Sequence, residues 1–258
     1  MLSVKNLHYH IGSKSIIDNI TIDFRPGTLY VIVGPNGSGK STFLKIFSGE
    51  IKPQRGEVLY DTIDIFHIQK KEIARRRAVM SQQPELHFPL TVSEVVMMGR
   101  YPHFNYKPSR QDENICDEMI SLMGIRGFEE RDYLTLSGGE KQRVQFARVL
   151  AQIYEAPAVG NRYLFLDEPI ASLDIHYQHE FLKIVQTFKK VNTIIVAVLH
   201  DLNLSVQYAD EMIFMKAGRI VKHGITSQVL SKELVQDVFD IPVNIIDNPV
   251  YNRPLLVF

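Results

Sequence analysis

Unbroken apolar runs and strictly alternating segments follow one another along the chain and predict two kinds of strand. Residues 29–33, 163–166 and 193–199 are nearly continuous apolar runs, which are typical of strands buried on both faces of a parallel sheet. Val79 and Met80 indicate the end of another strand. Residues 15–24 instead alternate apolar and polar side chains, as in an antiparallel strand with one exposed face. We therefore expect a mainly parallel core sheet with a small antiparallel sheet on its flank.

Helical patterns are concentrated between residues 84 and 150, where the strand signals vanish. Thr91 to Glu94 has the sequence of a capping box, which marks a helix start. A further helix is predicted near residues 232–239, and Pro242, Pro249 and Pro254 predict an irregular tail after it. The expected fold is thus α/β, in one domain. Its predicted parts are an α/β core with its antiparallel flank at 1–83 and 151–230, an inserted helical lobe at 84–150, and a tail at 231–258.

Composition restricts the classes of partner. The chain has 258 residues, enough to bury a core of its own. Its 29 basic and 29 acidic residues balance, so no excess positive charge indicates a nucleic-acid partner. The one cysteine, Cys116, cannot form an internal disulfide, and the first residues lack the apolar stretch of a secretory signal. The apolar runs are also far shorter than the roughly 20 residues of a membrane-spanning helix. We therefore expect a cytoplasmic protein that meets a membrane only peripherally.

A glycine-rich loop follows the apolar run 29–33 and precedes a helix predicted at 41–47. The spacing G-x-x-x-x-G-K-S in this strand–loop–helix context is typical of a nucleotide phosphate loop. Its glycines let backbone N–H groups approach the phosphates, Lys40 brings positive charge to the β and γ groups, and Ser41 can bind Mg²⁺. A glycine-rich turn without function explains the full spacing poorly. The predicted nucleotide-binding residues here are Gly34, Pro35, Asn36, Gly37, Ser38, Gly39, Lys40, Ser41 and Thr42.

Polar side chains follow two of the other apolar runs directly. Asp167 and Glu168 come after residues 163–166, and His200 comes after residues 193–199, at the strand ends where open parallel sheets bind ligands. We expect Asp167 to hold Mg²⁺ through its water shell and Glu168 to polarise or deprotonate an attacking water. His200 can donate to a γ-phosphate or orient Glu168. The plainer alternatives are solvated acids before a proline and a structural histidine.

A second glycine-opened helix start lies about a hundred residues after the phosphate loop. Ser137 and Glu140 form a predicted capping box, and capping alone is one interpretation. It leaves the two glycines Gly138 and Gly139 unexplained, because each costs about 1 kcal/mol relative to alanine inside a helix. Aligned N–H groups that bind a phosphate would explain them. We call such a set of phosphate-binding N–H groups a cradle. One triphosphate needs only one cradle from one subunit, so the second cradle is expected to face the γ-phosphate held by a partner molecule.

Three further positions give weaker signals. Gln82 and Gln83 lie where the core passes into the helical lobe, and a glutamine carbonyl there can reach Mg²⁺ or the attacking water and move when the γ-phosphate leaves. Which of the two does so stays open. Tyr9 can stack on adenine or be an ordinary strand aromatic. Ser172 can contact a partner subunit or cap the next helix.

In chain order, these motifs resemble the ATP-binding cassette (ABC) family of transporter ATPases over nearly the whole length. The matching features are Tyr9, the phosphate loop, Gln82, the signature Leu136 to Glu140, the acidic pair, Ser172-Leu173-Asp174 and His200. The resemblance implies a RecA-like P-loop core and ATP hydrolysis with Mg²⁺. It also implies a head-to-tail homodimer, in which each ATP lies between one phosphate loop and the signature of the other copy. By resemblance, Glu168 is the general base, Gln82 and His200 sense the γ-phosphate, and Ser41, Gln82 and Asp167 hold the metal.

The resemblance also suggests a cargo. The segments Leu173 to His179 and His200 to Leu204 are similar to those of iron-complex, haem and cobalamin importers, and residues 131–133 and 155–161 look most like haem-import ATPases. This implies two membrane permease subunits, an external substrate-binding protein, and a place on the cytoplasmic face of the membrane. A siderophore or cobalamin importer is the alternative. Ile170 departs from the usual threonine at a position with no assigned chemistry.

Other classes fit less well. A DNA-maintenance ATPase of the same superfamily would separate the two cradles by long heptad arms, which are absent between Lys40 and Ser137. A metabolic kinase would leave the second cradle unexplained. Within the helical lobe, a few apolar side chains are candidates for either the lobe core or a groove that receives the membrane subunit. They are Val95, Met97, Met98, Tyr101 and Phe104.

Overall fold

A six-stranded, mainly parallel sheet forms the centre of the molecule. The computed structural model describes residues 1–81, 86, 88–157, 159–250 and 253–258. The strand order is β10-β9-β3-β8-β7-β6, with β10 antiparallel to β9 and the other neighbours parallel. The strands are β3 (Thr28–Val33), β6 (Arg77–Met80), β7 (Arg162–Asp167), β8 (Thr193–Val198), β9 (Glu211–Lys216) and β10 (Arg219–Ile225). The predicted parallel core is therefore confirmed.

The apolar runs are continuous because each central strand contributes to two cores. Along β7, Leu164 and Leu166 join the core on one face of the sheet, whereas Tyr163 and Phe165 join the core on the other. Every residue of β7 and β8 is buried. A strand with helices or a second sheet on both sides has no solvent-facing side, so its pattern loses the alternation of a half-exposed strand.

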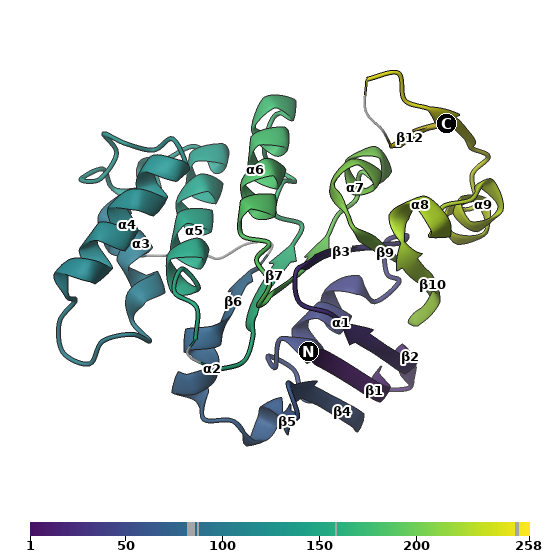
Figure 1. Ribbon diagram of the computed structural model, residues 1–258, viewed down its shortest axis with the longest axis horizontal. Helices are drawn as coiled ribbons and strands as arrows, with labels where there is room; N and C mark the ends of the chain where they lie inside the picture. The colour runs from purple at the N-terminus through teal and green to yellow at the C-terminus, as the bar shows by residue number, and fades with distance from the viewer. Residues whose placement is uncertain (82–85, 87, 158, 251–252) are drawn as a thin grey trace.

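The predicted antiparallel flank is a four-stranded sheet of order β2-β1-β4-β5. In β2 the buried and exposed side chains alternate toward its end, as the sequence pattern predicted. One face of this sheet and one face of the central sheet share a core with helix α1, which lies between them (Figure 1). The strands and helix are β1 (Leu2–Ile11), β2 (Lys14–Phe24), β4 (Arg55–Tyr60), β5 (Ile63–Asp64) and α1 (Lys40–Phe47).

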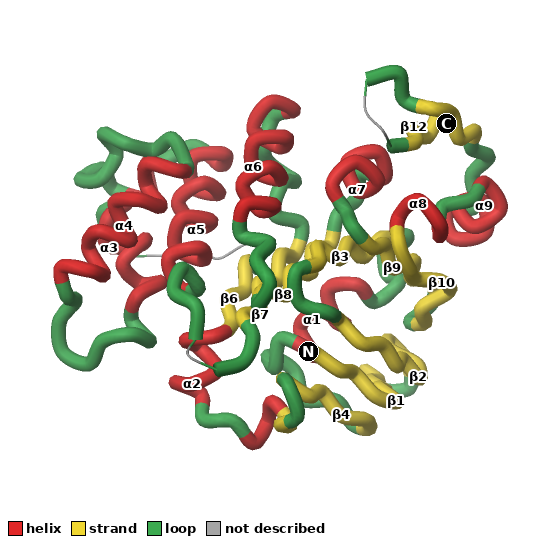
Figure 2. The backbone as a smooth tube through the Cα atoms, in the orientation of Figure 1, coloured by secondary structure: helices red, strands yellow, loops and turns green. Residues whose placement is uncertain are grey.

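The opposite face of the central sheet is covered by helices (Figures 1 and 2). The capping boxes predicted for Thr91 and Ser137 are both formed. Helices α3, α4 and α5 make the helical region at the left of Figure 1; the exact lobe boundaries stay a prediction. The helices are α2 (Lys70–Arg76), α3 (Val92–Met97), α4 (Arg110–Leu122), α5 (Gly138–Gln152), α6 (Ile175–Thr187), α7 (Leu202–Tyr208), α8 (Thr226–Val229) and α9 (Lys232–Phe239), with single 3-10 turns η1 (Ile65–His67), η2 (Met98–Arg100) and η3 (Tyr133–Thr135).

The C-terminal tail corrects one prediction. Helix α9 lies where the sequence predicted it, but the irregular tail after it contains a two-stranded antiparallel hairpin of β11 (Asn244–Asp247) and β12 (Pro254–Val257). The prolines do not prevent it, because Pro254 is the first residue of its strand and Pro249 lies between the strands, where a missing N–H costs no ladder hydrogen bond.

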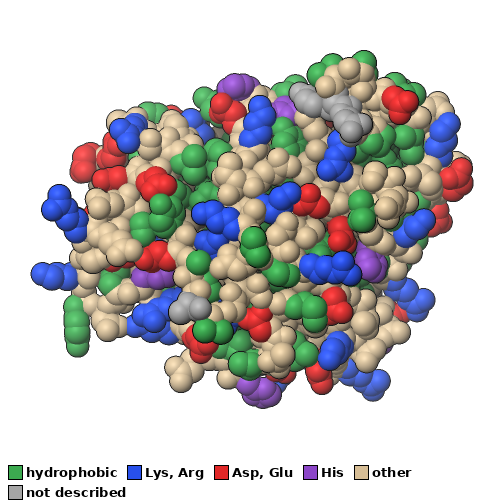
Figure 3. All heavy atoms as spheres, viewed as in Figure 1, with side chains coloured by type: hydrophobic (Ala, Val, Ile, Leu, Met, Phe, Trp, Pro, Cys, Tyr) green, Lys and Arg blue, Asp and Glu red, His purple; other side chains and the backbone are tan. Residues whose placement is uncertain are grey.

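Charge on the surface is mixed. On the face drawn in Figure 3, Lys and Arg side chains are interspersed with Asp and Glu side chains over most elements. This agrees with the overall balance of 29 basic and 29 acidic residues. Within the described residues, none of the helices combines the length and the apolar character needed to span a bilayer.

Candidate nucleotide-binding and hydrolysis site

The phosphate loop connects β3 to α1 and is shaped by close backbone contacts. Gly39 is the N-cap of α1 in a left-handed conformation with φ 98°. A Cβ there would lie 2.7 Å from the Ile16 carbonyl oxygen, and one at Gly34 would lie 2.2 Å from that of Met215. Only glycine tolerates both positions. Packing within this chain therefore requires glycine at positions 34 and 39, whereas a Cβ at Gly37 would meet no atom within 4 Å.

The turn between β9 and β10 supports the loop and was not found from the sequence. The Gly218 N–H donates to the Ser38 carbonyl at 3.0 Å, and the Gly218 carbonyl accepts from the Asp18 N–H at 2.9 Å. A Cβ at Gly218 would lie 2.6 Å from the Ile16 carbonyl oxygen. The sequence signal was a glycine between two strand patterns, which by itself indicates only a turn. Its contact with the phosphate loop depends on tertiary structure.

Lys40 lies over the loop. Its Nζ donates to the carbonyl oxygens of Gly34 at 2.8 Å and Pro35 at 3.0 Å. The side chain is buried, and this burial lowers the pKa of the amine, while the carboxylates of Glu168 and Asp167 act in the opposite direction. A buried cation held only by carbonyl dipoles is suited to bind an anion. The Ser38 hydroxyl beside Gly34 is also buried and makes no hydrogen bond within the described residues.

Asp167 meets the phosphate loop where β7 ends. Its Oδ1 accepts a hydrogen bond from the Ser41 hydroxyl at 2.9 Å. Burial raises the pKa of the Asp167 carboxyl above its usual value, and the hydrogen bond from Ser41 only partly offsets this. A hydroxyl and a buried carboxylate provide the hard oxygen ligands that Mg²⁺ prefers. These two residues therefore fit a magnesium site at the position the sequence predicted.

Glu168 and His200 come together because β7 and β8 are neighbours in the sheet. Asp167 is paired with Val198, so the residues that follow both strands emerge at the same edge. The His200 Nε2 lies 2.6 Å from Glu168 Oε1. Glu168 itself has a left-handed backbone with φ 50°, which is uncommon for a residue other than glycine and recurs at functional sites. This contact is compatible with the predicted orientation of Glu168 by His200, and the role of His200 stays a prediction.

The signature helix start exposes its first glycine, Gly138, whereas Gly139 is half-buried. Ser137 caps α5 through Glu140, and its backbone N–H donates to Glu140 Oε2 at 2.7 Å. Ser137 and Gly138 are exposed, and a Cβ at Gly138 would meet no atom within 4 Å. Capping is therefore confirmed, but neither conformation nor packing inside this chain requires glycine at position 138. Contact of Gly138 with a phosphate held by a partner stays a prediction.

Gln142 links the signature helix to the turn after the acidic pair. Its amide nitrogen donates to the Pro169 carbonyl, and its amide oxygen accepts from the Ser172 hydroxyl. The proposed helix cap at Ser172 is wrong, because the N-cap of α6 is Asp174, two residues later. The aspartate carboxylate lies next to the free N–H groups of the helix, whereas Ser172 is turned toward α5. Sequence reasoning missed Gln142, since one polar residue on an amphipathic helix gives no specific signal.

Two predicted site residues have a less defined place. Tyr9 lies on β1, opposite Ile17, and is half-buried against the core shared with α1. Because the adjacent Ile16 carbonyl touches Gly39 of the phosphate loop, Tyr9 is one strand away from the loop, and its contact with adenine stays a prediction. Gln82 and Gln83 lie outside the described residues.

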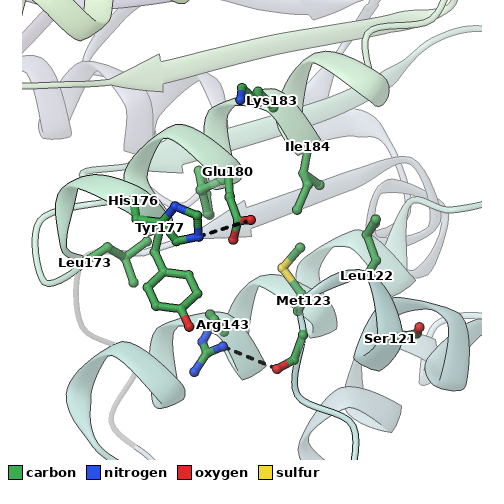
Figure 4. A pocket seen from close by; sticks show the side chains of 12 residues that line it. Ser121, Leu122, Met123, Arg143, Leu173, His176, Tyr177, Glu180, Lys183 and Ile184 are labelled. Atoms are coloured by element: carbon green, nitrogen blue, oxygen red, sulfur yellow. Dashed lines mark hydrogen bonds and ion pairs between the residues drawn. The ribbon is translucent and has the colours of Figure 1, made fainter.

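A separate cavity of about 570 Å³ lies between α4, α5 and α6 (Figure 4). Arg143 lines this cavity and donates a hydrogen bond to the Gly124 carbonyl at 3.3 Å. Its guanidinium carbon lies over the Tyr177 ring, 4.6 Å from the ring centroid. The lining contains neither the phosphate loop nor the acidic pair. The proposed hydrolysis residues thus lie at the sheet edge, outside this cavity.

Comparison with known proteins agrees with this geometry. The ABC transporter family profile matches residues 17–171. The hemin import ATP-binding protein HmuV of Gloeobacter violaceus is 40% identical over 257 residues, covering 100% of this chain and 94% of that protein. HmuV of Myxococcus xanthus is 40% identical, covering 99% and 96%. The cassette MJ0796, solved as a post-hydrolysis dimer bound to ADP and Pi, has a TM-score of 0.74 and 26% identity, covering 88% of this chain and 99% of that chain.

Proposed function

Because this chain belongs to the ABC transporter family and is an ATP-hydrolysing subunit of an importer of that family, we propose that it drives the uptake of haem. The observation that carries the cargo is the pair of hemin import proteins that match along the whole chain at 40% identity. Haem itself would cross through the membrane subunits. The histidines of this chain therefore need no role as haem ligands.

ABC cassettes bind ATP and ADP, dimerise and pair with membrane components. The finer proposal is a head-to-tail homodimer in which Ser137, Gly138 and Gly139 of one copy contact the γ-phosphate held by the phosphate loop of the other. The exposure of Ser137 and the open space around Gly138 support it. A second set of helix N–H groups that its own chain leaves uncovered is suited to an anion from outside.

The proposed hydrolysis uses groups that already lie together. Lys40 would exchange its hydrogen bonds to the carbonyls of Gly34 and Pro35 for hydrogen bonds to phosphate oxygens. Ser41 and Asp167 would hold Mg²⁺, which would neutralise part of the negative charge of the phosphates. Glu168 would orient and deprotonate the attacking water. His200 would hold the Glu168 carboxylate in place through the 2.6 Å contact. The proposed roles of Gln82, as metal ligand and γ-phosphate sensor, and of Tyr9, under adenine, complete the site.

The remaining partners are proposed on the same basis. Two permease subunits would bind this dimer at the cytoplasmic face of the membrane, and an external binding protein would deliver the cargo. Among the candidate contact residues in the helical region, Val95 is fully buried and belongs to the core. Tyr101 is 56% exposed and packs edge-on against Phe104, so this aromatic pair is the better candidate for contact with a membrane subunit.

The cargo is tested by reconstitution with the cognate permease in proteoliposomes. We expect ATP-dependent accumulation of haem, and no accumulation of a ferric siderophore or of cobalamin at the same concentration. The Glu168→Gln variant is the matched control, because it retains the assembly and removes the proposed base. Accumulation of cobalamin or siderophore in place of haem would contradict the proposed cargo while leaving the ATPase assignment intact.

A further inference from the structure

The first turn of α7 begins immediately after His200, so its position determines where the imidazole lies. Asp201 caps the helix by accepting from the Leu204 N–H at 2.9 Å, and its carbonyl accepts from the Ser205 hydroxyl at 2.6 Å. Helix α7 has only seven residues. A helix this short gains little stability from its own hydrogen bonds and depends on its tertiary contacts.

One of these contacts joins α7 to the C-terminal hairpin. The Asn203 side-chain amide uses both of its ends on one residue of β12. Its Nδ2 donates to the Leu256 carbonyl at 3.1 Å, and its Oδ1 accepts from the Leu256 N–H at 2.8 Å. The two residues are 53 positions apart. The paired geometry of the two bonds fixes the direction in which Asn203 points.

The hairpin is also anchored by burial of an apolar side chain. Leu256 is buried and belongs to the large apolar core that covers one face of the central sheet. A two-stranded hairpin is at best marginally stable alone, so β11 and β12 depend on this docking. The docking is reciprocal, because an interaction that orders the hairpin against α7 also restrains α7 against the hairpin.

The end of the chain reaches the neighbourhood of His200 itself. A cleft of about 430 Å³ has His200 and Asn203 on its α7 side and Phe239, Ile241 and Phe258 on its C-terminal side. The segment after α9 therefore makes the opposite wall of the space beside the imidazole. No other part of the described chain lines this cleft.

From these contacts we propose that Asn203 is a positioning residue, which ties the first turn of α7 to Leu256 and so holds His200 in register with Glu168. The proposal rests on the proposed function, since it assumes that the Glu168–His200 pair acts in hydrolysis. The side-chain amide of Asn203 forms its hydrogen bonds with Leu256 and with neither member of that pair. Its effect would come from restricting the backbone that carries His200, because a small misplacement of a positioned group is costly in rate.

The test compares ATP hydrolysis by the full chain with Asn203→Ala and with Asn203→Asp. The aspartate keeps one oxygen that can accept from the Leu256 N–H. Its second oxygen replaces the amide nitrogen and cannot donate to the Leu256 carbonyl. We expect kcat to fall roughly tenfold in Asn203→Ala, with KM for ATP within about twofold, since the phosphate loop is untouched. Asn203→Asp should fall between the wild type and Asn203→Ala.

Two controls separate this role from a purely structural one. Lys232→Ala removes another contact of the hairpin, the 2.9 Å bond to Asn244, without touching α7, and it should leave kcat unchanged. Leu256→Ala keeps the backbone groups that Asn203 binds but removes the buried side chain that docks β12. It should lower kcat, and the double variant with Asn203→Ala should lower it no further, because both changes weaken the same attachment of β12 to α7.

The outcomes distinguish the two proposals. If Glu168→Gln abolishes hydrolysis but Asn203→Ala retains wild-type kcat, the positioning role is wrong and the proposed function stands. If Asn203→Ala lowers ATP binding and thermal stability along with kcat, Asn203 has only a structural role and the inference is overturned. If Glu168→Gln hydrolyses ATP normally, the assignment of Glu168 fails, and the positioning role fails with it.

Discussion

The Asp167 carboxylate lies in surroundings that oppose its negative charge. It is buried at the end of β7, and its neighbour Glu168 is also acidic. Among the described residues, the Ser41 hydroxyl is the one side-chain donor that forms a hydrogen bond with it. Functional groups are often kept in such unfavourable surroundings because a ligand compensates for them. At this position, the ligand that compensates best is a cation held jointly with Ser41.

Removal of this charge should stabilise the nucleotide-free protein. The folded-state pKa of Asp167 is raised by burial, so its ionisation opposes folding above that pKa and not below the unfolded value. We predict that Asp167→Asn raises Tm near neutral pH, and that the gain shrinks as the pH falls through the raised pKa. Thermal unfolding between pH 4 and 8 without nucleotide measures this. An equal gain at every pH would show that its source is not the charge.

The same substitution should have the opposite effect with ligand. Mg²⁺ and ATP together should raise the Tm of the wild type more than that of Asp167→Asn, because the variant has lost one of two proposed metal-binding oxygens. ATP with EDTA should stabilise both proteins similarly. An identical response of both to Mg²⁺ would contradict the assignment of Asp167.

At the scale of single elements, α5 is the helix that links the two halves of the proposed mechanism. Its N-terminus carries the exposed Gly138, and Gln142 on its first turns ties it to the segment that follows the acidic pair. Farther along, Gln152 donates to the carbonyls of Ala74 and Arg77 in the core. Contact of Gly138 with a partner can therefore be transmitted to the hydrolysis residues through one rigid helix.

We predict that Gly138→Ala folds and binds ATP but does not turn over. Alanine in place of glycine in a helix stabilises by up to about 1 kcal/mol, and a Cβ here meets nothing in the monomer. Only a molecule brought close from outside would meet it. The measurements are Tm, equilibrium ATP binding and steady-state hydrolysis, with Gln111→Ala on the exposed start of α4 as a surface control. Wild-type turnover in Gly138→Ala would show that no partner approaches this position.

What the sequence could predict at this scale depended on whether the signal was local. The buried strands, the capping boxes at Thr91 and Ser137, and the helix at 232–239 were predicted because each follows from a short run of residues. The strand β12 was missed, because it is only four residues long and its stability comes from docking on α7. Gly218 and Gln142 were missed for the same reason, since their contacts join segments far apart in sequence.

At the scale of the whole molecule, the proposed shared site would make the monomer an incomplete ATPase. The phosphate loop, Asp167, Glu168 and His200 converge on one edge of the central sheet, as the order of strands and motifs predicted. The signature helix start instead presents exposed, unexplained glycine to solvent. The proposed antiparallel dimer accounts for both facts at once, because it brings each signature to the phosphate loop of the other copy.

The most direct test is the association state of Glu168→Gln, measured by size-exclusion chromatography with light scattering in the presence of ATP and Mg²⁺. The variant should bind ATP but hydrolyse it at least about a hundredfold more slowly, and so accumulate as a dimer. Without nucleotide, or with Ser137→Arg added, it should be monomeric. A Glu168→Gln protein that is saturated with ATP and remains monomeric at every accessible concentration would contradict the shared site.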